Sequence, residues 1–243
     1  MTEPAGKLRR DPPRSSPSYA VRAPLARWLR DEASAASARG ATRVLDVGCG
    51  VKPYAPWFEF AASYVGVDVV ENPYADLRGA VEALPVEDRS FDVVLCLQVL
   101  EHSDDPAQAV RELRRVTAPG GRVLASTHGV QVYHPSPDDL WRWTHAGLEQ
   151  LFDENGDWSS VTVQPGSGTA ACLGMLVSIY VDLAARRAHA SFAGRPLVSA
   201  LNGLAAALDR RSALLRGTGP GTLHANYHVT AEVAAVHRER DAG

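Results

Sequence analysis

Cysteine is scarce in this chain of 243 residues, and so are long apolar runs. The three cysteines, at positions 49, 96 and 172, form no C-x-x-C pair. Such an odd, scattered set argues against a disulfide framework and favours a reducing, cytoplasmic compartment. No segment reaches the roughly 18 apolar residues expected of a membrane span. The nearest, residues 169–185, is interrupted by Ser178 and Asp182.

An excess of charge of one sign is also missing. Lysine and arginine number 25 against 28 acidic residues, for a net charge of −3. This balance provides no basic field for nucleic acid, so no nucleic-acid partner is expected. The first forty residues lack the apolar core of a signal peptide. Prolines and charges alternate in residues 1–18, which predicts a flexible arm before one domain over residues 19–243.

Two short apolar runs each end in residues suited to binding a ligand. Residues 44–50 read VLDVGCG and residues 64–68 read YVGVD. Each is typical of a buried strand, and the first ends in glycines that let backbone N–H groups approach a ligand closely. The second ends at Asp68, an acid placed to accept hydrogen bonds from ribose hydroxyls. The third glycine of a dinucleotide fingerprint and the P-loop sequence are both absent. The pattern therefore favours a nucleoside without a pyrophosphate.

With these runs the chain resembles class I S-adenosylmethionine-dependent methyltransferases, whose first motif is similar to VLDVGCG. Two more segments support the resemblance: EALPVEDRSFD followed by VVLCLQVLEH over residues 82–102, and RELRRVTAPGGRVLAS over residues 111–126. The motifs stand in the family's order, across about a third of the chain. The resemblance implies a Rossmann-like α/β fold, doubly wound around a mainly parallel seven-stranded sheet, with S-adenosylmethionine as cofactor.

Periodicity along the chain agrees with alternating strands and helices. We expect strands near 42–47, 63–68, 79–82, 91–97, 122–127, 158–164 and 225–234, and helices over 19–38, 52–60, 104–118 and 144–153. The last two strands are separated by some sixty residues, which is too long for a structureless loop. Residues 165–223 are therefore interpreted as a helical insertion of two helices. It is a candidate substrate lid, dimer face or membrane-surface patch.

The resemblance also assigns cofactor-binding roles to particular positions. The residues implied are Asp46, Gly48, Gly50, Asp68, Val69, Val81, Glu82 and Gln98. Asp46 and the two glycines would shape the pocket for the amino-acid moiety and sugar, and Asp68 would bind the ribose. Val69, Val81 and Glu82 would border the adenine, and Gln98 would lie near the methionine end. Ala80 stands where many relatives have aspartate. The pair Glu101-His102 is expected to be positional in this family.

The segment STHGVQVYHPSPDDLWRWTH, residues 126–145, is the best candidate for acceptor chemistry. It leaves the carboxyl end of the fifth strand, the edge at which open α/β sheets bind ligands. Similar segments occur in bacterial methyltransferases of polysaccharide and secondary-metabolite clusters. His128 and His134 are the candidate catalytic bases. The candidate substrate-binding residues are Tyr133, Trp141, Arg142, Trp143 and His145; the two tryptophans could equally anchor the following helix.

These observations predict a biosynthetic S-adenosylmethionine-dependent methyltransferase of a small molecule or glycan, forming an O-methyl group. Two alternatives stay open. One is a methyltransferase of a lipid-like or quinone-like acceptor, with the insertion in peripheral contact with a membrane. The other is a non-catalytic protein that binds the cofactor. No cluster has convincing metal-ligand spacing, so no metal is expected. A homodimer through the insertion is the candidate assembly.

Overall fold

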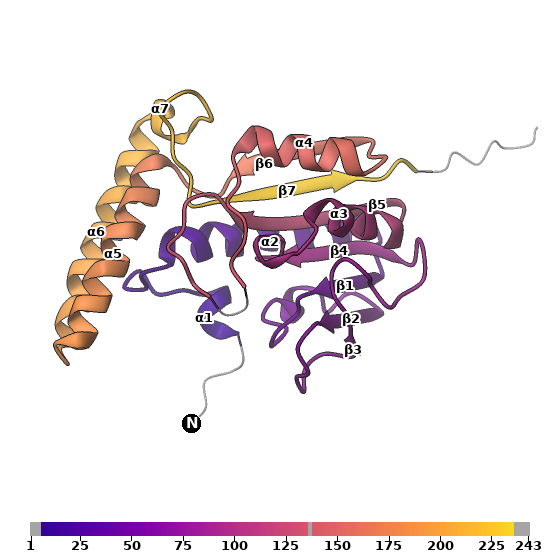
Figure 1. The fold of residues 1–243 in the computed structure, drawn as a ribbon, viewed down its shortest axis with the longest axis horizontal. Coiled ribbons are helices and arrows are strands. Elements are labelled where there is room, and N and C mark those ends of the chain that lie inside the picture. Colours follow the sequence, from indigo (N-terminus) through magenta and orange to yellow (C-terminus); the bar gives the residue numbers. More distant parts are fainter. Residues whose placement is uncertain (1–5, 136–137, 236–243) are drawn as a thin grey trace, which may run out of the picture.

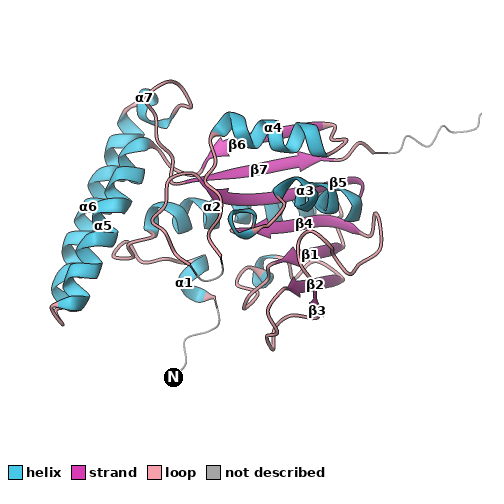
Figure 2. Ribbon diagram, viewed as in Figure 1, coloured by secondary structure: helices cyan, strands magenta, loops and turns pink. Residues whose placement is uncertain are grey.

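A seven-stranded sheet runs through the middle of the molecule in the computed structural model (Figures 1 and 2). The structure describes residues 6–135 and 138–235. The strands are β1 (Arg43–Val47), β2 (Ser63–Asp68), β3 (Leu77–Arg78), β4 (Phe91–Leu97), β5 (Thr117–His128), β6 (Ser160–Pro165) and β7 (Asn226–Glu232). Their order is β3-β2-β1-β4-β5-β7-β6, and β7 alone runs antiparallel to its neighbours. This confirms the predicted mainly parallel, doubly wound sheet.

Helices cover both faces of the sheet. They are α1 (Lys7–Arg10), α2 (Tyr19–Ala38), α3 (Pro106–Val116), α4 (His145–Asn155), α5 (Thr169–Arg187), α6 (Ser191–Arg211) and α7 (Ala213–Arg216), with 3-10 turns η1 (Ala55–Trp57) and η2 (Leu100–His102). On one face α2 buries Leu25 and Leu29 against Val44 and Leu95. On the other face α3 and α4 pack on the alternate residues of the same strands. The two cores hold the strands' carboxyl ends in place.

Most expected elements form within two residues of their expected bounds, and three do not. The strand expected over 122–127 begins earlier, at Thr117, because Thr117 already pairs with Phe91 of β4. The strand expected over 79–82 is wrong: β3 ends at Arg78, because the chain turns there to pack Pro85 against Gly79. The helix expected over 52–60 shrinks to the single turn η1. Pro56 lacks the N–H that would bond to the Lys52 carbonyl in such a helix, which explains the loss; Pro53 would lie in the first turn, where proline is tolerated.

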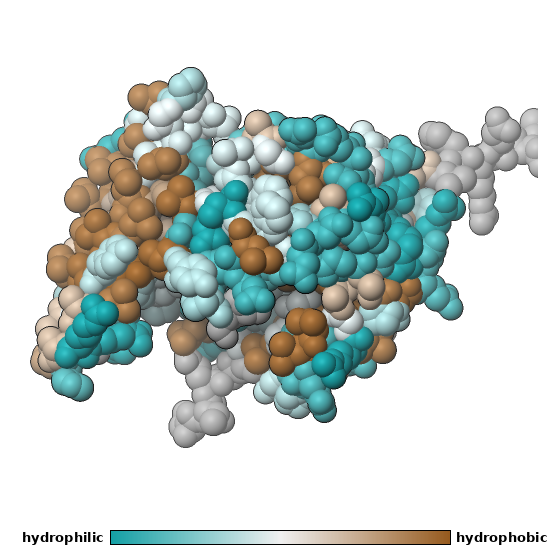
Figure 3. All heavy atoms as spheres, in the orientation of Figure 1, coloured by the Kyte–Doolittle hydropathy of each residue, from teal (hydrophilic) through white to brown (hydrophobic). Residues whose placement is uncertain are grey.

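The insertion between β6 and β7 is a helical hairpin, as expected, and it stands at the carboxyl end of the sheet (Figure 1, orange). Helices α5 and α6 approach closely where Gly174 meets Ala205. One side of α5 buries Cys172 and Met175 against α2. The outer side exposes a row of large apolar residues, and brown spheres gather there in Figure 3. This row, here called the outer hairpin face, consists of Leu173, Val177, Tyr180, Leu183, Leu197, Leu204 and Leu208.

Helix α5 is long and apolar enough to span a membrane by length and composition alone, with 28% of its most apolar window buried. The residues before α2 also contact the hairpin. The Asn202 side-chain amide on α6 donates to the carbonyl oxygens of Arg14, at 2.7 Å, and Ser16, at 3.0 Å. Residues 14–16 are therefore held on α6. The flexibility expected of residues 1–18 stays a prediction.

Candidate active site

The glycine turn after β1 lies at the point where the strand order reverses, between β1 and β4. Gly48 and Gly50 have φ angles of 66° and 50°, which side-chain-bearing residues rarely adopt. A Cβ at Gly48 would overlap Val99, whereas a Cβ at Gly50 would meet no atom within 4 Å. The turn therefore packs on one side and faces open space on the other, as a ligand-binding turn requires.

Asp68 closes the open side of this turn from the end of β2. One carboxylate oxygen accepts the Gly50 N–H at 2.9 Å, and the other accepts the Val70 N–H at 3.1 Å. Each oxygen keeps a lone pair for a further donor. Val69 is 55% exposed beside it and offers an apolar surface. An acid fixed by two backbone donors, next to open space and an exposed valine, fits the ribose and base of a nucleoside.

Asp46 lies beneath the turn and is buried. Its carboxylate accepts the Tyr64 hydroxyl at 2.7 Å. Burial raises the pKa of Asp46 to about 7, and the Tyr64 hydrogen bond opposes that rise. Asp46 is enclosed by protein atoms, so its part in a cofactor pocket is to support the turn from below.

The other implied cofactor residues differ in what they present. Val81 is buried in the core, and the Glu82 carboxylate accepts hydrogen bonds from Ser103 and from the Asp104 N–H. Neither side chain is offered to a ligand, so an adenine contact here would use the backbone. Gln98 has a left-handed backbone, with φ 59°, at the end of β4. Its side-chain amide donates to the Ser126 hydroxyl at 2.9 Å, which fixes it between the ends of β4 and β5.

His128, at the end of β5, contacts a buried carboxyl group that the sequence did not single out. Its Nε2 lies 3.2 Å from Glu101 Oε1, and the other Glu101 oxygen accepts the Thr127 hydroxyl at 2.8 Å. Glu101 is fully buried, and burial raises its pKa to about 7. Burial also lowers the pKa of His128 to about 3, and its Nδ1 has no partner among the described residues. Glu101 Oε1 has no hydrogen-bond partner among the described residues, so its approach to His128 is a close contact without hydrogen-bond geometry. His128 is therefore an enclosed imidazole whose neutral form is favoured by burial.

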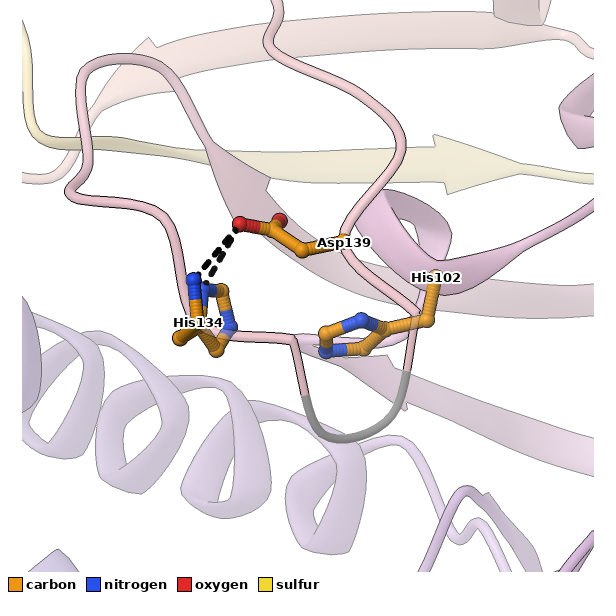
Figure 4. A group of neighbouring side chains, drawn as sticks. All are labelled: His102, His134 and Asp139. Carbon is orange, nitrogen blue, oxygen red and sulfur yellow. Dashed lines mark hydrogen bonds and ion pairs between the residues drawn. The ribbon is translucent and has the colours of Figure 1, made fainter.

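His134 differs from His128 in being partly exposed, and it lies beside Asp139 (Figure 4). Its Nδ1 lies 3.0 Å from Asp139 Oδ2, in a contact bent away from ideal hydrogen-bond geometry, and the side chain is 38% exposed. Arg142 donates to both Asp139 oxygens at 2.6 Å. That hydrogen bonding is the main cause that holds the pKa of Asp139 far below its usual range. An ionised Asp139 favours the proton on His134 Nδ1 and leaves Nε2 free as a base.

His102, His134 and Asp139 also form a group with metal-ligand chemistry (Figure 4). One donor atom from each lies within 4.8 Å of the others. Asp139, however, already has both oxygens on the Arg142 guanidinium, and His102 Nδ1 lies 2.7 Å from the Asp138 carbonyl. A divalent cation would have to compete with a guanidinium for the same carboxylate. The arrangement fits an oriented histidine better than a metal centre.

The aromatic residues of the segment divide between the surface and the core. Trp141 and Trp143 stack with ring centroids 5.7 Å apart, and Trp141 donates to the Ser103 carbonyl at 2.8 Å. Trp143 packs partly on the core, so the pair does anchor the loop. Tyr133 is 72% exposed. His145 faces the Val163 carbonyl through Nε2 and Glu149 through Nδ1, which gives it a structural position at the start of α4.

Two residues of the cluster escaped the sequence argument, Glu101 and Asp139. The E-H pair after β4 was a signal for Glu101, although it was interpreted as positional. The loop 129–144 folds back over η2, where the Leu140 and Trp141 N–H groups donate to the Glu101 carbonyl at 2.9 and 3.2 Å. These hydrogen bonds hold the loop against η2 and so bring Glu101 and Asp139 close to His128 and His134. The spacing of these residues in the sequence does not predict the contact.

Comparison with known proteins agrees with this geometry. Residues 45–125 match the methyltransferase domain family. A ubiquinone biosynthesis O-methyltransferase of Bordetella bronchiseptica is 35% identical over 116 residues, 41% of this chain and 47% of that protein. A malonyl-acyl-carrier-protein O-methyltransferase of Erwinia billingiae is 33% identical over 133 residues, 50% of this chain and 53% of that protein. The chain thus spans about half the length of the curated relatives it matches.

Among solved structures, the cyclase SpnF superposes with a TM-score of 0.54 at 19% identity, covering 87% of this chain and 82% of that one. The likeness shows the fold alone. It extends across nearly the whole chain, including segments beyond the matched domain, and supports the Rossmann-like methyltransferase fold.

Proposed function

We propose that this protein, which carries a class I S-adenosylmethionine-dependent methyltransferase domain, transfers a methyl group to an oxygen of a small-molecule acceptor. The observation that carries the proposal is the pairing of an intact cofactor turn with an oriented histidine at the same sheet edge. Gly50 and Asp68 lie at the carboxyl ends of β1 and β2, and His134 follows β5. O-methyltransferases among the partial relatives support the same reaction class.

When bound, S-adenosylmethionine supplies an activated methyl group, so the chain has only to align the acceptor and manage one proton. His134 Nε2 accepts the proton of the acceptor hydroxyl as the oxygen forms its bond to the methyl carbon. Asp139 stabilises the resulting imidazolium and is itself kept ionised by Arg142. His128 is a weaker candidate base, because burial favours its neutral form. Its contact with Glu101 makes it a positioning residue at the floor of the cluster.

We propose the acceptor class and the cellular setting from the composition and the surface of the chain. A glycan or secondary metabolite suits the exposed Tyr133 and the stacked tryptophans, because flat aromatic surfaces bind sugar rings. Composition supports a cytoplasmic enzyme without a nucleic-acid partner. The outer hairpin face favours one second candidate, an acceptor of lipid or quinone type reached at a membrane surface, or else a homodimer contact.

The test begins with labelled S-adenosylmethionine and fractionated extract of the source organism, followed by mass identification of the labelled product. Transfer that needs detergent or membrane fractions favours the lipid-type acceptor. With the acceptor known, His134→Gln and Asp139→Asn should lower kcat by about 100-fold or more, the usual contribution of a positioned base. Calorimetry should show cofactor affinity unchanged within about threefold, since neither His134 nor Asp139 belongs to the glycine turn or contacts Asp68.

His189→Asn is the matched control, because His189 lies at the exposed turn between α5 and α6 with φ 53°, which asparagine tolerates. It should leave kcat unchanged. Tight cofactor binding with no label transferred to any fraction would contradict the proposal and favour a non-catalytic binding protein. Full activity in His134→Gln would remove that residue from the chemistry.

A further inference from the structure

A cavity of about 460 Å³ opens at the carboxyl end of β6, between the start of α2 and the α5–α6 hairpin. It is separate from the glycine turn and from the histidine cluster, since no residue of either lines it. Its volume lies in the range of small-molecule sites. The neutral and apolar part of its lining includes Tyr19, Ala20, Pro24 and Ala171.

Four arginines line the same cavity: Arg14, Arg27, Arg210 and Arg216. Within the described residues, none of the four has an ion-pair partner. The single acid of the lining, Asp209, is buried and already accepts the Ala170 and Ala171 N–H groups at 3.0 Å. The cavity thus carries an uncompensated positive charge in a chain whose net charge is −3. Guanidinium groups without carboxylates match an anion with several oxygens, above all phosphate.

The walls of the cavity are tied together across the sequence. Asn202, on α6, holds the carbonyl oxygens of Arg14 and Ser16. His224 bridges the other wall, with Nδ1 2.9 Å from the Ser167 carbonyl and Nε2 2.9 Å from the Gly217 carbonyl. These hydrogen bonds fix the backbone beside Arg14 and Arg216. The arginines therefore surround a preformed space, which lowers the cost of ordering it around a ligand.

The cavity lies within reach of the histidine cluster. Pro165, in the lining, pairs with Tyr227 on β7, which pairs with Thr127 next to His128 on β5. Pro165 and Thr127 are therefore two strand spacings apart, or about 10 Å. Val130, at the start of the loop that carries His134, packs on the same cluster as the lining residues Ala20 and Ala171. One elongated molecule of moderate size can therefore contact both places.

We propose that the cavity binds a phosphate group on the methyl acceptor whose hydroxyl His134 deprotonates. That the bound molecule is the methyl acceptor rests on the proposed function. Binding of a phosphate ester to the cavity does not depend on that function. The arginines then select the acceptor by its charge, and the cofactor turn takes no part.

The test is direct binding of sn-glycerol 3-phosphate, measured by calorimetry on the full chain, with glycerol and inorganic phosphate alongside. Arg27→Gln and Arg216→Gln should each weaken ester binding about three- to fivefold, the contribution of a partly exposed charge, and the double variant by about tenfold. Arg210→Gln should weaken it similarly. Arg211→Gln is the matched control, because Arg211 is the exposed neighbour of Arg210 on α6 and does not line the cavity.

Equal losses in Arg210→Gln and Arg211→Gln would mean diffuse attraction to surface charge and would overturn the proposal. So would absence of saturable ester binding at millimolar concentration, or ester binding no tighter than that of inorganic phosphate. A third arm uses vesicles containing phosphatidylglycerol. Vesicle binding that the Arg27→Gln/Arg216→Gln variant abolishes, with no binding of the soluble ester, would assign the arginines to a lipid surface instead.

S-adenosylmethionine affinity measured on the same variants keeps the two proposals apart. Ester binding without cofactor binding or methyl transfer would refute the proposed function and leave the cavity as an anion site. Methyl transfer to an acceptor without any phosphate, at rates equal in wild type and the double variant, would refute the inference and leave the proposed function intact.

Discussion

Glu101 is the most consequential buried ionisable group of the active-site cluster, and the conservative change Glu101→Gln tests its protonation. The glutamine keeps an oxygen for the Thr127 hydroxyl, which donates at 2.8 Å, and offers an N–H₂ group toward His128. Size and packing are unchanged, so the variant removes only the ability to ionise. The quantity to follow is the free energy of unfolding of both proteins as a function of pH.

The magnitude follows from the pKa of Glu101, which burial raises from 4.5 to about 7. A raised carboxyl pKa means that the fold favours the protonated form. The stabilisation is complete below the unfolded-state pKa and is lost as pH rises through the folded-state value. At about 1.4 kcal/mol per pH unit, ionisation in the fold costs about 3 kcal/mol more than in the unfolded chain. Glutamine cannot ionise and so loses nothing over this range.

Urea unfolding of both proteins between about pH 5 and pH 8 measures the effect. The wild type should lose about 2–3 kcal/mol relative to Glu101→Gln over that interval. Asp46 contributes equally to both proteins and cancels in the difference. Glu149→Gln, a partly exposed carboxylate beside His145, is the control and should show no such trend. If the stability difference between wild type and Glu101→Gln is constant with pH, then burial does not hold Glu101 in its neutral form and the reasoning is refuted.

Three further predictions concern the cofactor, the metal group and the hairpin. Asp68→Ala should weaken S-adenosylmethionine binding about tenfold or more in calorimetry, because charged hydrogen bonds are lost. Glu71→Ala, which changes an exposed acid three residues on, is the control and should leave binding unchanged. Equal affinities of wild type and Asp68→Ala would remove Asp68 from the site. Activity should survive chelation and dialysis, because Arg142 occupies the carboxylate of the His102–His134–Asp139 group; loss of activity that a divalent metal restores would refute this. Leu173→Ser and Val177→Ser on the outer hairpin face should change self-association or vesicle binding in light scattering, with cofactor affinity changed less than about threefold. Loss of cofactor binding in a variant that stays folded would instead place the hairpin in the cofactor site.

The sequence predicted the sheet and the cofactor turn well because both are encoded locally. A run such as VLDVGCG specifies a buried strand and, by its glycines, the positive φ angles of the turn within seven residues. The N-cap of α3 is equally local, since the Asp105 side chain accepts the Gln108 N–H three residues on. The error over residues 52–60 arose where Pro56 interrupted a pattern that hydrophobic spacing alone suggested. Near residues 79–82 the chain leaves the sheet at Gly79, which lies against Pro85.

The same limit applies to the surface of α5. Apolar residues occur all along residues 169–185, so spacing alone did not separate the stripe that packs on α2 from the exposed stripe. The structure places Leu176 and Ile179 against the core and leaves Leu173 and Val177 about half exposed. The positions of α2 and α6 decide which stripe is covered, and α2 lies some 150 positions earlier in the chain.

The residues that we propose for acceptor binding lie outside the segment that the family model matches. The family match ends at residue 125, whereas His128, His134 and Asp139 all follow it. The arginine cavity combines residues before α2 with the hairpin, joined by a hydrogen bond from Asn202 to a carbonyl 188 residues earlier. The match over residues 45–125 therefore bears on the fold and the proposed cofactor, and it does not reach the residues that we propose for the acceptor. Under this proposal the loop after β5 and the hairpin after β6 select the acceptor, so binding measurements on variants of those two segments are the direct route to its identity.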